Sequence, residues 1–542
     1  MVIFLWSACV FYSDEDRDRD GDGALAIAFG GQDCEDGNAI IHPEAIETCN
    51  GVDDNCNGQI DDSAADARAW FADADGDGFG SDTTTSCEAG LGLVEMDGDC
   101  DDGNNVVFPG ATEDICTELD EDCDGSGFAA SAEPNARLGG ETGGTSGIGA
   151  ALATGQQDGV GEVLVAGSAD AGTTLIFALE QATYSDSSER WASVEGGGGL
   201  VAFGDAFVGT VDRDDLIIGD AGWDAGRGRV GIFQLAQTGG EHTWDVASKV
   251  YEAPNPGDGL GGGITFFQGD DDYSSILMLG APGTDEGRGA VYIRQLTAGG
   301  ESGASDVSVG AYGVVTSTDY VVNAGLGLSI GGWADSANSL YGAYGAPGQQ
   351  GRFGTDTGAL AIAQIGTIDI LNTSTHVYTG AGGGDRFTHA IASGDIDGDG
   401  LDELAVSAPG HDTDGGVAGG AVYILAGTVI ESDVAGGVFQ HELDSAVVVV
   451  EGDVEGRGLG RAIKLDGDVL VASAWLASCD GGDPGAVYVI ELGMSGKLVV
   501  RDSQRQIVGE PDSGVGDALL ITQSGLWVGE LAASRVERFP TD

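Results

Sequence analysis

Short apolar runs separated by glycine-rich turns dominate the chain from residue 136 to residue 539. Runs such as Leu404–Ala408 and Ala421–Ile424 are bounded by turn residues and are too short for typical helices, which favours β-strands. A glycine-bearing start, an apolar run, a turn and a second run recur at a period of roughly 60 residues, which suits a four-stranded sheet. We count seven such units, which begin near Gly147, Ala202, Gly259, Gly325, Phe387, Gly458 and Gly514.

One further run, Ala136–Gly139, precedes the first unit, and no run follows Phe539 to complete the last unit. We therefore expect the early run to pair with the last unit, because this pairing would close a ring of sheets and remove its exposed edges. The predicted fold is all-β, with a seven-bladed β-propeller over residues 129–542. An open β-solenoid and a pair of sandwiches are the alternatives, and the count of seven favours the propeller.

Residues 13–128 have a different pattern, polar and rich in cysteine and aspartate. They contain two copies of one unit, about residues 13–62 and 70–128, and an Asp-Cys pair occurs at Asp33 in the first copy and at Asp99 in the second. So polar a stretch cannot build an apolar core. We expect metal ions and disulfides to hold this small region together, with little regular structure.

One loop of the fifth unit has the spacing of a calcium site. From Asp395 onward, oxygen-bearing side chains stand at positions 1, 3, 5 and 9, and a glycine stands at position 6. Alternate carboxylates turn inward, the backbone carbonyl of position 7 adds a ligand, and glycine permits the sharp turn. The predicted Ca²⁺ ligands are Asp395, Asp397, Asp399, Leu401 through its carbonyl, and Glu403.

Four similar strings precede residue 129. One has positions 1, 3, 5 and 9 filled, and the other three have positions 1, 3 and 5 filled. A single string can be an Asx-rich turn, but several in register with cysteines favour calcium. The predicted ligands are Asp53, Asn55, Asn57 and Asp61; Asp73, Asp75 and Asp77; Asp18, Asp20 and Asp22; and Asp120, Asp122 and Asp124, this last set being incomplete because Phe128 is its ninth residue.

The fifth unit, with its metal loop and following hairpin, resembles the FG-GAP repeat of integrin α-subunit propellers, with Phe387-Thr388 where that family has Phe-Gly. The two cysteine- and aspartate-rich copies resemble the metal-binding motif of secreted bacterial proteins, which is itself similar to thrombospondin type 3 calcium repeats. The resemblance implies a propeller that binds a ligand through loops on one face. The chain has no matched ligand-contact motif.

The charge and the cysteine content restrict the possible partners and the cellular compartment of the protein. With 21 Lys and Arg against 90 Asp and Glu, the net charge is -69, which argues against nucleic acid or an anionic membrane as partner. Seven of nine cysteines lie between Cys34 and Cys123, at spacings that indicate disulfides and an oxidising compartment. The pairs suggested by spacing are Cys49–Cys56, Cys116–Cys123 and Cys87–Cys100, although spacing does not fix connectivity. Zinc and copper are disfavoured because paired CxxC spacing and clustered histidines are missing from the sequence.

The first residues suggest export. Residues 1–12 form an apolar run too short to span a bilayer, and nothing later in the sequence resembles a transmembrane helix. Leu5–Cys9 resembles a bacterial lipobox, which would place a lipid anchor at Cys9; an ordinary export signal fits equally well. The expected location is extracellular or the bacterial cell surface or outer membrane.

The leading hypothesis is an exported, calcium-binding, non-enzymatic adhesion or ligand-binding protein, with the propeller on a metal- and disulfide-stabilised stalk and an extracellular protein or glycan as partner. A propeller-bearing hydrolase or lyase and a calcium-loaded surface scaffold without a ligand are the alternatives. The string Gly327–Gly331 matches the nucleophile motif G-x-S-x-G, but it falls on a predicted strand rather than a strand-to-helix turn. The sequence does not indicate an oligomeric state.

Overall fold

In the computed structural model, the chain forms two compact units, Met1–Phe128 and Ala129–Asp542. Among the described residues, no helix is long and apolar enough to cross a membrane. The structure describes residues 17–111, 119–123, 136–139, 148–157, 161–168, 173–179, 190–196, 199–204, 214–234, 239–268, 275–296, 303–308, 311–316, 323–334, 340–350, 355–365, 376–413, 417–426, 439–441, 443, 446–452, 457–474, 485–493, 496–500, 503, 505–509, 514–523, 525–530 and 535–540.

The first unit has little regular structure in its described part, as its polar composition predicts. Strand β1 (Arg68–Ala72) pairs antiparallel with β3 (Thr83–Ser86) and β4 (Leu93–Val94), and β2 (Phe79–Gly80) pairs parallel with β5 (Met96–Asp97). A short 3-10 turn, η1, covers Ile27–Phe29. Turns and loops make up most of the rest.

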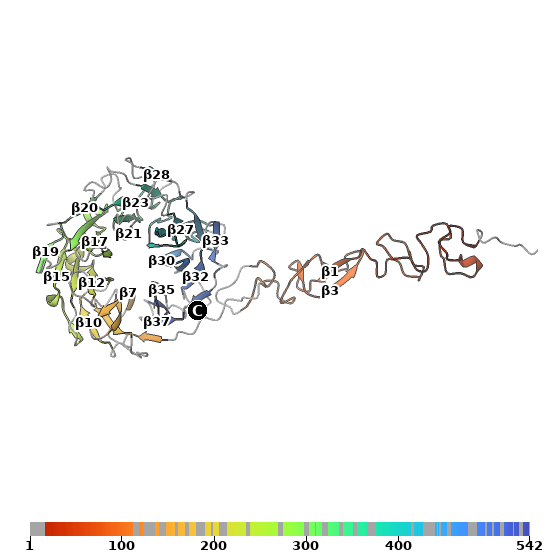
Figure 1. Ribbon diagram of the computed structural model, residues 1–542, viewed down its shortest axis with the longest axis horizontal. Helices are drawn as coiled ribbons and strands as arrows, with labels where there is room; N and C mark the ends of the chain where they lie inside the picture. The colour runs from red at the N-terminus through yellow and green to blue at the C-terminus, as the bar shows by residue number, and fades with distance from the viewer. Residues whose placement is uncertain are drawn as a thin grey trace, which may run out of the picture. The chain divides into compact units, whose positions relative to one another are not determined.

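The second unit is all-β in its described part (Figure 1). The strands are β6 Ala136–Gly139, β7 Ile148–Gln157, β8 Gly161–Ser168, β9 Thr173–Ala178, β10 Ala192–Glu195, β11 Leu200–Gly204, β12 Asp215–Asp220, β13 Arg229–Phe233, β14 Gly240–His242, β15 Lys249–Glu252, β16 Gly263–Gln268, β17 Ser275–Ala281, β18 Ala290–Leu296, β19 Gly303–Asp306, β20 Gly313–Thr316, β21 Ser329–Ala334, β22 Leu340–Ala346, β23 Ala359–Gln364, β24 His376–Thr379, β25 Ile391–Gly394, β26 Glu403–Ala408, β27 Ala421–Leu425, β28 Phe439–His441, β29 Val448–Glu451, β30 Leu459–Asp466, β31 Val469–Ala474, β32 Ala486–Glu491, β33 Gly496–Val499, β34 Arg505–Val508, β35 Val515–Thr522, β36 Gly525–Glu530 and β37 Arg535–Phe539. Three short helical turns lie between the strands in the described residues, α2 Trp223–Gly226, η3 Trp244–Val246 and α3 Thr284–Gly287.

The described strands of this unit form seven sheets of four or five strands, which succeed one another around a common centre in Figure 1. The strand orders are β14-β10-β9-β8-β7, β11-β12-β13-β15-β19, β16-β17-β18-β20, β21-β22-β23-β24-β28, β25-β26-β27-β29-β33, β30-β31-β32-β34 and β35-β36-β37-β6. The hairpins that were predicted from alternating runs and turns are therefore present. The expected pairing of the early run is also confirmed, since β6 pairs antiparallel with β37.

Four of the sheets carry a fifth strand that the sequence did not predict. Strands β14, β19, β28 and β33 each pair in parallel with the outer strand of the preceding sheet. Each of these strands lies in the connection between the third and fourth strands of the next sheet. The extra strand thus satisfies backbone groups of an outer edge and ties one sheet to its neighbour.

The core of this unit lies between neighbouring sheets. The second strands, such as β17 and β26, are buried along their whole length because apolar side chains cover both faces. One apolar cluster joins Tyr378 of the fourth sheet to Leu404 and Tyr423 of the fifth. Another joins Leu138 and Trp527 of the last sheet to Leu164 of the first. The first and last sheets therefore share a core.

Thr388 occupies a backbone position that is glycine in other units. Its φ is 74°, in the left-handed region that a β-branched residue rarely adopts, whereas Gly261 and Gly327 have φ of 94° and 91°. The Thr388 hydroxyl donates a hydrogen bond to the carbonyl of Ala359 at 3.1 Å, and its backbone N–H donates to Ser407 O at 2.8 Å. These bonds hold the residue in a conformation that glycine adopts without strain.

Candidate metal sites

Three aspartate loops have one shared backbone geometry. The first aspartate of each loop accepts hydrogen bonds from the backbone N–H groups of positions 4 and 6. The distances are 2.8 and 3.1 Å for Asp18, 2.6 and 3.2 Å for Asp73, and 2.7 and 3.0 Å for Asp395. Both oxygens of position 1 therefore shape the turn.

The third and fifth positions use one oxygen each in the same way. The Oδ1 atoms of Asp20, Asp75 and Asp397 accept from the N–H two residues on, at 3.4, 3.3 and 3.1 Å. Those of Asp22, Asp77 and Asp399 do the same at 2.7, 2.9 and 2.8 Å. In each loop, carboxylate oxygens of the three aspartates lie within 4.8 Å of one another. Such a group of negative charges is stable when a cation lies among them.

The glycine at position 6 has a positive φ in all three loops, 97° at Gly23, 103° at Gly78 and 87° at Gly400. This conformation turns the chain back so that its N–H reaches the first aspartate. The sequence prediction of a sharp turn at this position is thus correct.

The loop from Asp53 follows this pattern in part. Asp53 accepts from the N–H groups of Asn57 and Gly58, at 3.0 and 2.8 Å, and Asn55 Oδ1 accepts from Asn57 N at 3.0 Å. Asp61, the predicted ninth-position ligand, instead receives hydrogen bonds from the N–H groups of Asn50 and Gly51. Its carboxylate is therefore engaged by a different turn.

The Asp395 loop connects β25 to β26. Glu403, at the start of β26, is 6% exposed, and its Oε2 accepts from Ile396 N at 3.0 Å. Leu401 lies at position 7, where its N–H donates to Asp399 Oδ1. Burial raises the pKa of Asp402, and the nearby charge of Asp395 adds to the shift. Glu403 thus lies at the loop as predicted, but it is outside the close group of three aspartates.

Two aspartates that the sequence interpretation did not select lie beside the N-terminal loops. Asp33 is 2% exposed and Asp99 is 6% exposed. Burial raises the pKa of both carboxyls, and repulsion from Asp22 and Asp20 adds to the shift at Asp33, as repulsion from Asp77 and Asp75 does at Asp99. Each therefore lies near enough to the preceding loop for the charges of that loop to repel it.

These two residues were missed because they are far from the loops along the chain, and at two different separations. Asp33 follows Asp22 by 11 residues, whereas Asp99 follows Asp77 by 22 residues. A signal was nevertheless present, since each stands directly before a cysteine, Cys34 or Cys100, in matching Asp-Cys pairs.

The remaining predicted set is only partly described. Asp120 and Asp122 lie in the described part of the chain, and Asp124 lies outside it. Cys9 and residues 1–12, to which the export signal and lipid anchor were assigned, also lie outside the described residues.

The predicted disulfide pairs were wrong. The structure pairs Cys34 with Cys56 and Cys100 with Cys123, at sequence separations of 22 and 23, and Cys49 with Cys87 at a separation of 38. Cys116 lies outside the described residues. The bridges join cysteines distant in sequence, because the chain turns back at Cys56 and at Cys123, where φ is 59° and 58°. Each of the two equivalent bridges thus closes one copy of the repeat.

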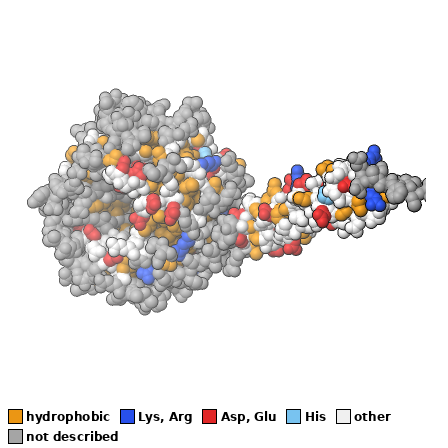
Figure 2. All heavy atoms as spheres, turned by 45° about the vertical axis from the view of Figure 1, so that its right-hand side comes forward, with side chains coloured by type: hydrophobic (Ala, Val, Ile, Leu, Met, Phe, Trp, Pro, Cys, Tyr) orange, Lys and Arg blue, Asp and Glu red, His pale blue; other side chains and the backbone are white. Residues whose placement is uncertain are grey.

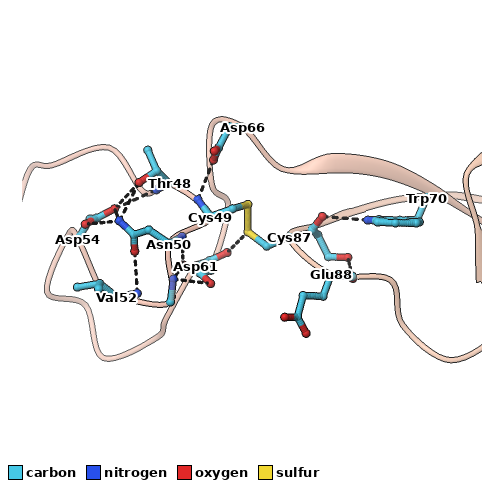
Figure 3. The surroundings of a disulfide bond; sticks show 12 residues. Thr48, Cys49, Asn50, Val52, Asp54, Asp61, Asp66, Trp70, Cys87 and Glu88 are labelled. Carbon is cyan, nitrogen blue, oxygen red and sulfur yellow. Dashed lines mark hydrogen bonds between the residues drawn. A yellow bond between two sulfur atoms is a disulfide. The ribbon is translucent and has the colours of Figure 1, made fainter.

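The third disulfide connects the first copy to the residue just after β3, in the second copy (Figure 3). The N–H of Cys49 donates to Asp66 Oδ1 at 2.8 Å, and the indole of Trp70 donates to Ser86 O at 3.0 Å, next to Cys87. Asn50, beside Cys49, donates to both oxygens of Asp54. Hydrogen bonds to Asn50 and Thr48 lower the pKa of Asp54, so that this carboxylate is held ionised.

Other ligand types are scarce around these loops. The six cysteines above are in disulfides, so they offer no thiolate. His42 Nδ1 accepts a hydrogen bond from Glu44 N at 3.3 Å. Figure 2 shows acidic side chains on the viewed face of both units. The available donors are mainly carboxylate oxygens, which suit a hard divalent cation.

The G-x-S-x-G string enters a strand at its serine, and its last three residues belong to β21. Ser329 is the first residue of β21, is 8% exposed, and donates its hydroxyl hydrogen to Thr388 O. It lies on no strand-to-helix turn that would expose a nucleophile.

Comparison with known proteins identifies both motif types. The family model Cu-binding_MopE, described as "Putative metal-binding motif", matches residues 33–62 and 99–127, and the FG-GAP repeat model matches residues 387–425. No curated protein matches the chain. A solved structure titled as the computationally designed Ika8 protein is similar at 14% identity and a TM-score of 0.39, covering 75% of this chain and 99% of that one.

Proposed function

We propose that the protein is an exported, calcium-binding protein without enzymatic activity, whose second unit binds an extracellular protein or glycan. The observation that carries the proposal is the shared loop geometry, in which three aspartates at alternate positions place carboxylate oxygens within 4.8 Å of one another in three separate loops.

Calcium fits this donor set better than copper does. Ca²⁺ takes six to eight oxygen ligands in flexible geometry, and the loops offer carboxylates, backbone carbonyls and open positions for water. Copper prefers imidazole, thiolate or thioether ligands. The copper in the name of the matched family is therefore not the ion we propose here.

The second unit would be a closed seven-bladed propeller. Support comes from the seven sheets, from the pairing of β6 with β37, and from the core that the first and last sheets share. Closure removes the sheet edges that an open array would leave unpaired. A rigid ring would present its connecting loops as a binding surface, which is the arrangement that the FG-GAP match favours.

Export is supported by the disulfides of the first unit, because such bonds persist in oxidising compartments. We assign the protein to the extracellular space or the bacterial surface, with Cys9 as the candidate lipid anchor. In this assignment, the first unit is a metal- and disulfide-stabilised region that carries the propeller.

The metal assignment is tested by stripping the full chain with chelator and titrating it with CaCl₂ and, separately, CuSO₄ in a calorimeter. We expect several calcium ions to bind and the first unit to become protease-resistant. Copper binding with no calcium binding would refute the assignment. Glycan arrays and cell-adhesion assays, each with calcium and with chelator, test the ligand-binding role. A calcium-independent hydrolase or lyase activity on glycans would contradict this role.

A further inference from the structure

Asp33 and Asp99 are held in equivalent places beside two aspartate loops. Ala26, just beyond the Asp18 loop, pairs in parallel with Asp33, and Asp33 N donates to Leu25 O at 3.1 Å. In the second copy, β2 directly follows the Asp73 loop and pairs in parallel with β5, which ends two residues before Asp99. The backbone thus brings each aspartate to its loop by the same type of pairing.

A second contact fixes each loop against the same segment. Arg19 N, in the first loop, donates to Asp36 Oδ1 at 3.0 Å, and Ala74 N, in the second, donates to Asp102 Oδ1 at 2.9 Å. Asp36 and Asp102 each stand three residues after the buried aspartate. Both the parallel pairing and this hydrogen bond are present in the two copies, so the arrangement is a property of the repeat.

Each buried aspartate has one satisfied oxygen and one oxygen without a partner. The Oδ1 atoms of Asp33 and Asp99 accept from Glu35 N and Asp101 N, at 2.8 and 2.9 Å. Their Oδ2 atoms are buried with no hydrogen-bond donor. The same is true of one oxygen on each of the third- and fifth-position aspartates, Asp20, Asp22, Asp75 and Asp77.

Three unpartnered carboxylate oxygens in each copy therefore lie where protein donors do not reach them. A buried oxygen of this kind costs free energy unless a proton or a cation satisfies it. Protonation of one carboxyl would supply one donor for three oxygens, whereas a divalent cation takes several carboxylate oxygens as ligands. The charge and the number of orphan oxygens favour the cation.

We propose that Asp33 and Asp99 each supply a ligand to a calcium ion held by the preceding aspartate loop, so that each ion joins two segments of the chain. The sites are then Asp18, Asp20, Asp22 with Asp33, and Asp73, Asp75, Asp77 with Asp99. Asp36 and Asp102 are positioning residues that hold the loop against the segment. This inference rests on the proposed calcium binding and extends each metal-binding unit beyond the matched ranges 33–62 and 99–127.

The test uses the full chain, stripped of metal and titrated with CaCl₂ by calorimetry. Asp33→Asn and Asp99→Asn are compared alone and together, with Glu44→Gln and Asp82→Asn as controls, which remove one charge each from exposed positions of the same unit. We expect each single variant to weaken one site at least tenfold, the double variant to weaken two, and the controls to bind as the wild type does.

Protease resistance in chelator separates a ligand from a structural carboxylate. If Asp33 is a calcium ligand, Asp33→Asn removes a buried negative charge that has no counter-ion in chelator. In chelator, residues 17–62 of the variant should then resist protease at least as well as those of the wild type. Added calcium should increase this resistance less in the variant than in the wild type. Lower resistance in chelator would indicate a structural role and overturn the inference.

Two further outcomes are distinguishable. Unchanged calcium binding in the Asp33→Asn/Asp99→Asn variant, with two ions lost from Asp20→Asn/Asp75→Asn, would overturn this inference and leave the proposed function standing. Absence of calcium binding by the wild type would overturn both.

Discussion

Asp395 and Asp397 belong to one loop but have different tasks. Both carboxylate oxygens of Asp395 accept hydrogen bonds from backbone N–H groups, so substitution of Asp395 would disturb the turn. Asp397 accepts such a hydrogen bond through Oδ1 only. We predict that Asp397→Asn, which keeps a carbonyl acceptor and removes the charge, abolishes one calcium site and leaves the second unit folded. Calorimetry should show one ion fewer, with a metal-free melting temperature within about 2 °C of the wild type.

Asp468→Asn is the matched control, because this residue is exposed in a turn of another sheet of the same unit. It should leave the calcium stoichiometry unchanged. An unchanged stoichiometry in Asp397→Asn would remove the Asp395 loop from the set of sites.

Glu530 is a buried carboxyl whose titration should affect stability. It is 1% exposed, and it shares Arg535 with Glu537, at 2.8 and 3.2 Å. Burial raises the pKa of Glu530 from 4.5 to about 8, and repulsion from Glu537 adds to this shift. The attraction of Arg535 opposes the shift but is smaller. The folded state therefore holds this proton more tightly than the unfolded state does.

Because the folded pKa is raised, the stabilisation from the bound proton is complete below the unfolded pKa of 4.5 and is lost as the pH rises through about 8. We predict that the second unit loses stability between pH 5 and 8.5, by on the order of a few kcal/mol, and that Glu530→Gln removes most of this loss. Thermal melts in chelator measure it. Glu195→Gln, at an exposed position, should retain the wild-type pH dependence, and a Glu530→Gln variant that also retains it would refute the prediction.

At the scale of strands and loops, local signals account for what the sequence predicted. The hairpin from β26 to β27 follows from two apolar runs and a glycine turn, and the Asp395 turn follows from alternating aspartates and Gly400. Strands such as β14 and β33 could not be predicted, because their pairing with the preceding sheet depends on tertiary position rather than on an apolar pattern. Asp33 and Asp99 were missed for the same reason.

The disulfides show this limit most clearly. Cys56 is the nearest cysteine to Cys49 along the sequence, but in the folded chain Cys56 pairs with Cys34, and Cys49 pairs with Cys87. We predict that removing the Cys49–Cys87 bridge, with a separation of 38 residues, by Cys49→Ser/Cys87→Ser destabilises the first unit by about 4 kcal/mol in the chain-entropy description.

Protease resistance of residues 17–111 in calcium measures this loss, with Cys479→Ser in the second unit as the control. Non-reducing peptide mapping of the wild type should recover Cys49 joined to Cys87 and Cys34 joined to Cys56. Recovery of Cys49 joined to Cys56 would contradict the structure.

At the scale of the whole chain, the two units depend on different forces. The second unit has apolar clusters between neighbouring sheets, including Tyr378, Leu404 and Trp527. The buried apolar residues of the first unit, in its described part, are Ala26, Ile41, Ala64, Trp70, Val107 and Ala111. Since so few apolar side chains cannot offset the entropy of ordering the chain, we expect the disulfides and bound metal ions to supply much of the stability of the first unit.

Chelation should therefore unfold the first unit and spare the second. At a free calcium concentration of about ten times Kd, each ion stabilises the folded state by roughly 1.4 kcal/mol. Among the described residues, the first unit has two aspartate loops and the related Asp53 loop, and the second unit has one aspartate loop. We predict that limited proteolysis in chelator cuts residues 17–111 first and leaves a fragment of about residues 129–542. Restored calcium should protect the first unit, whereas magnesium, which demands octahedral geometry, should protect it less. Equal cleavage of both units in chelator would show that the metal does not hold the first unit together.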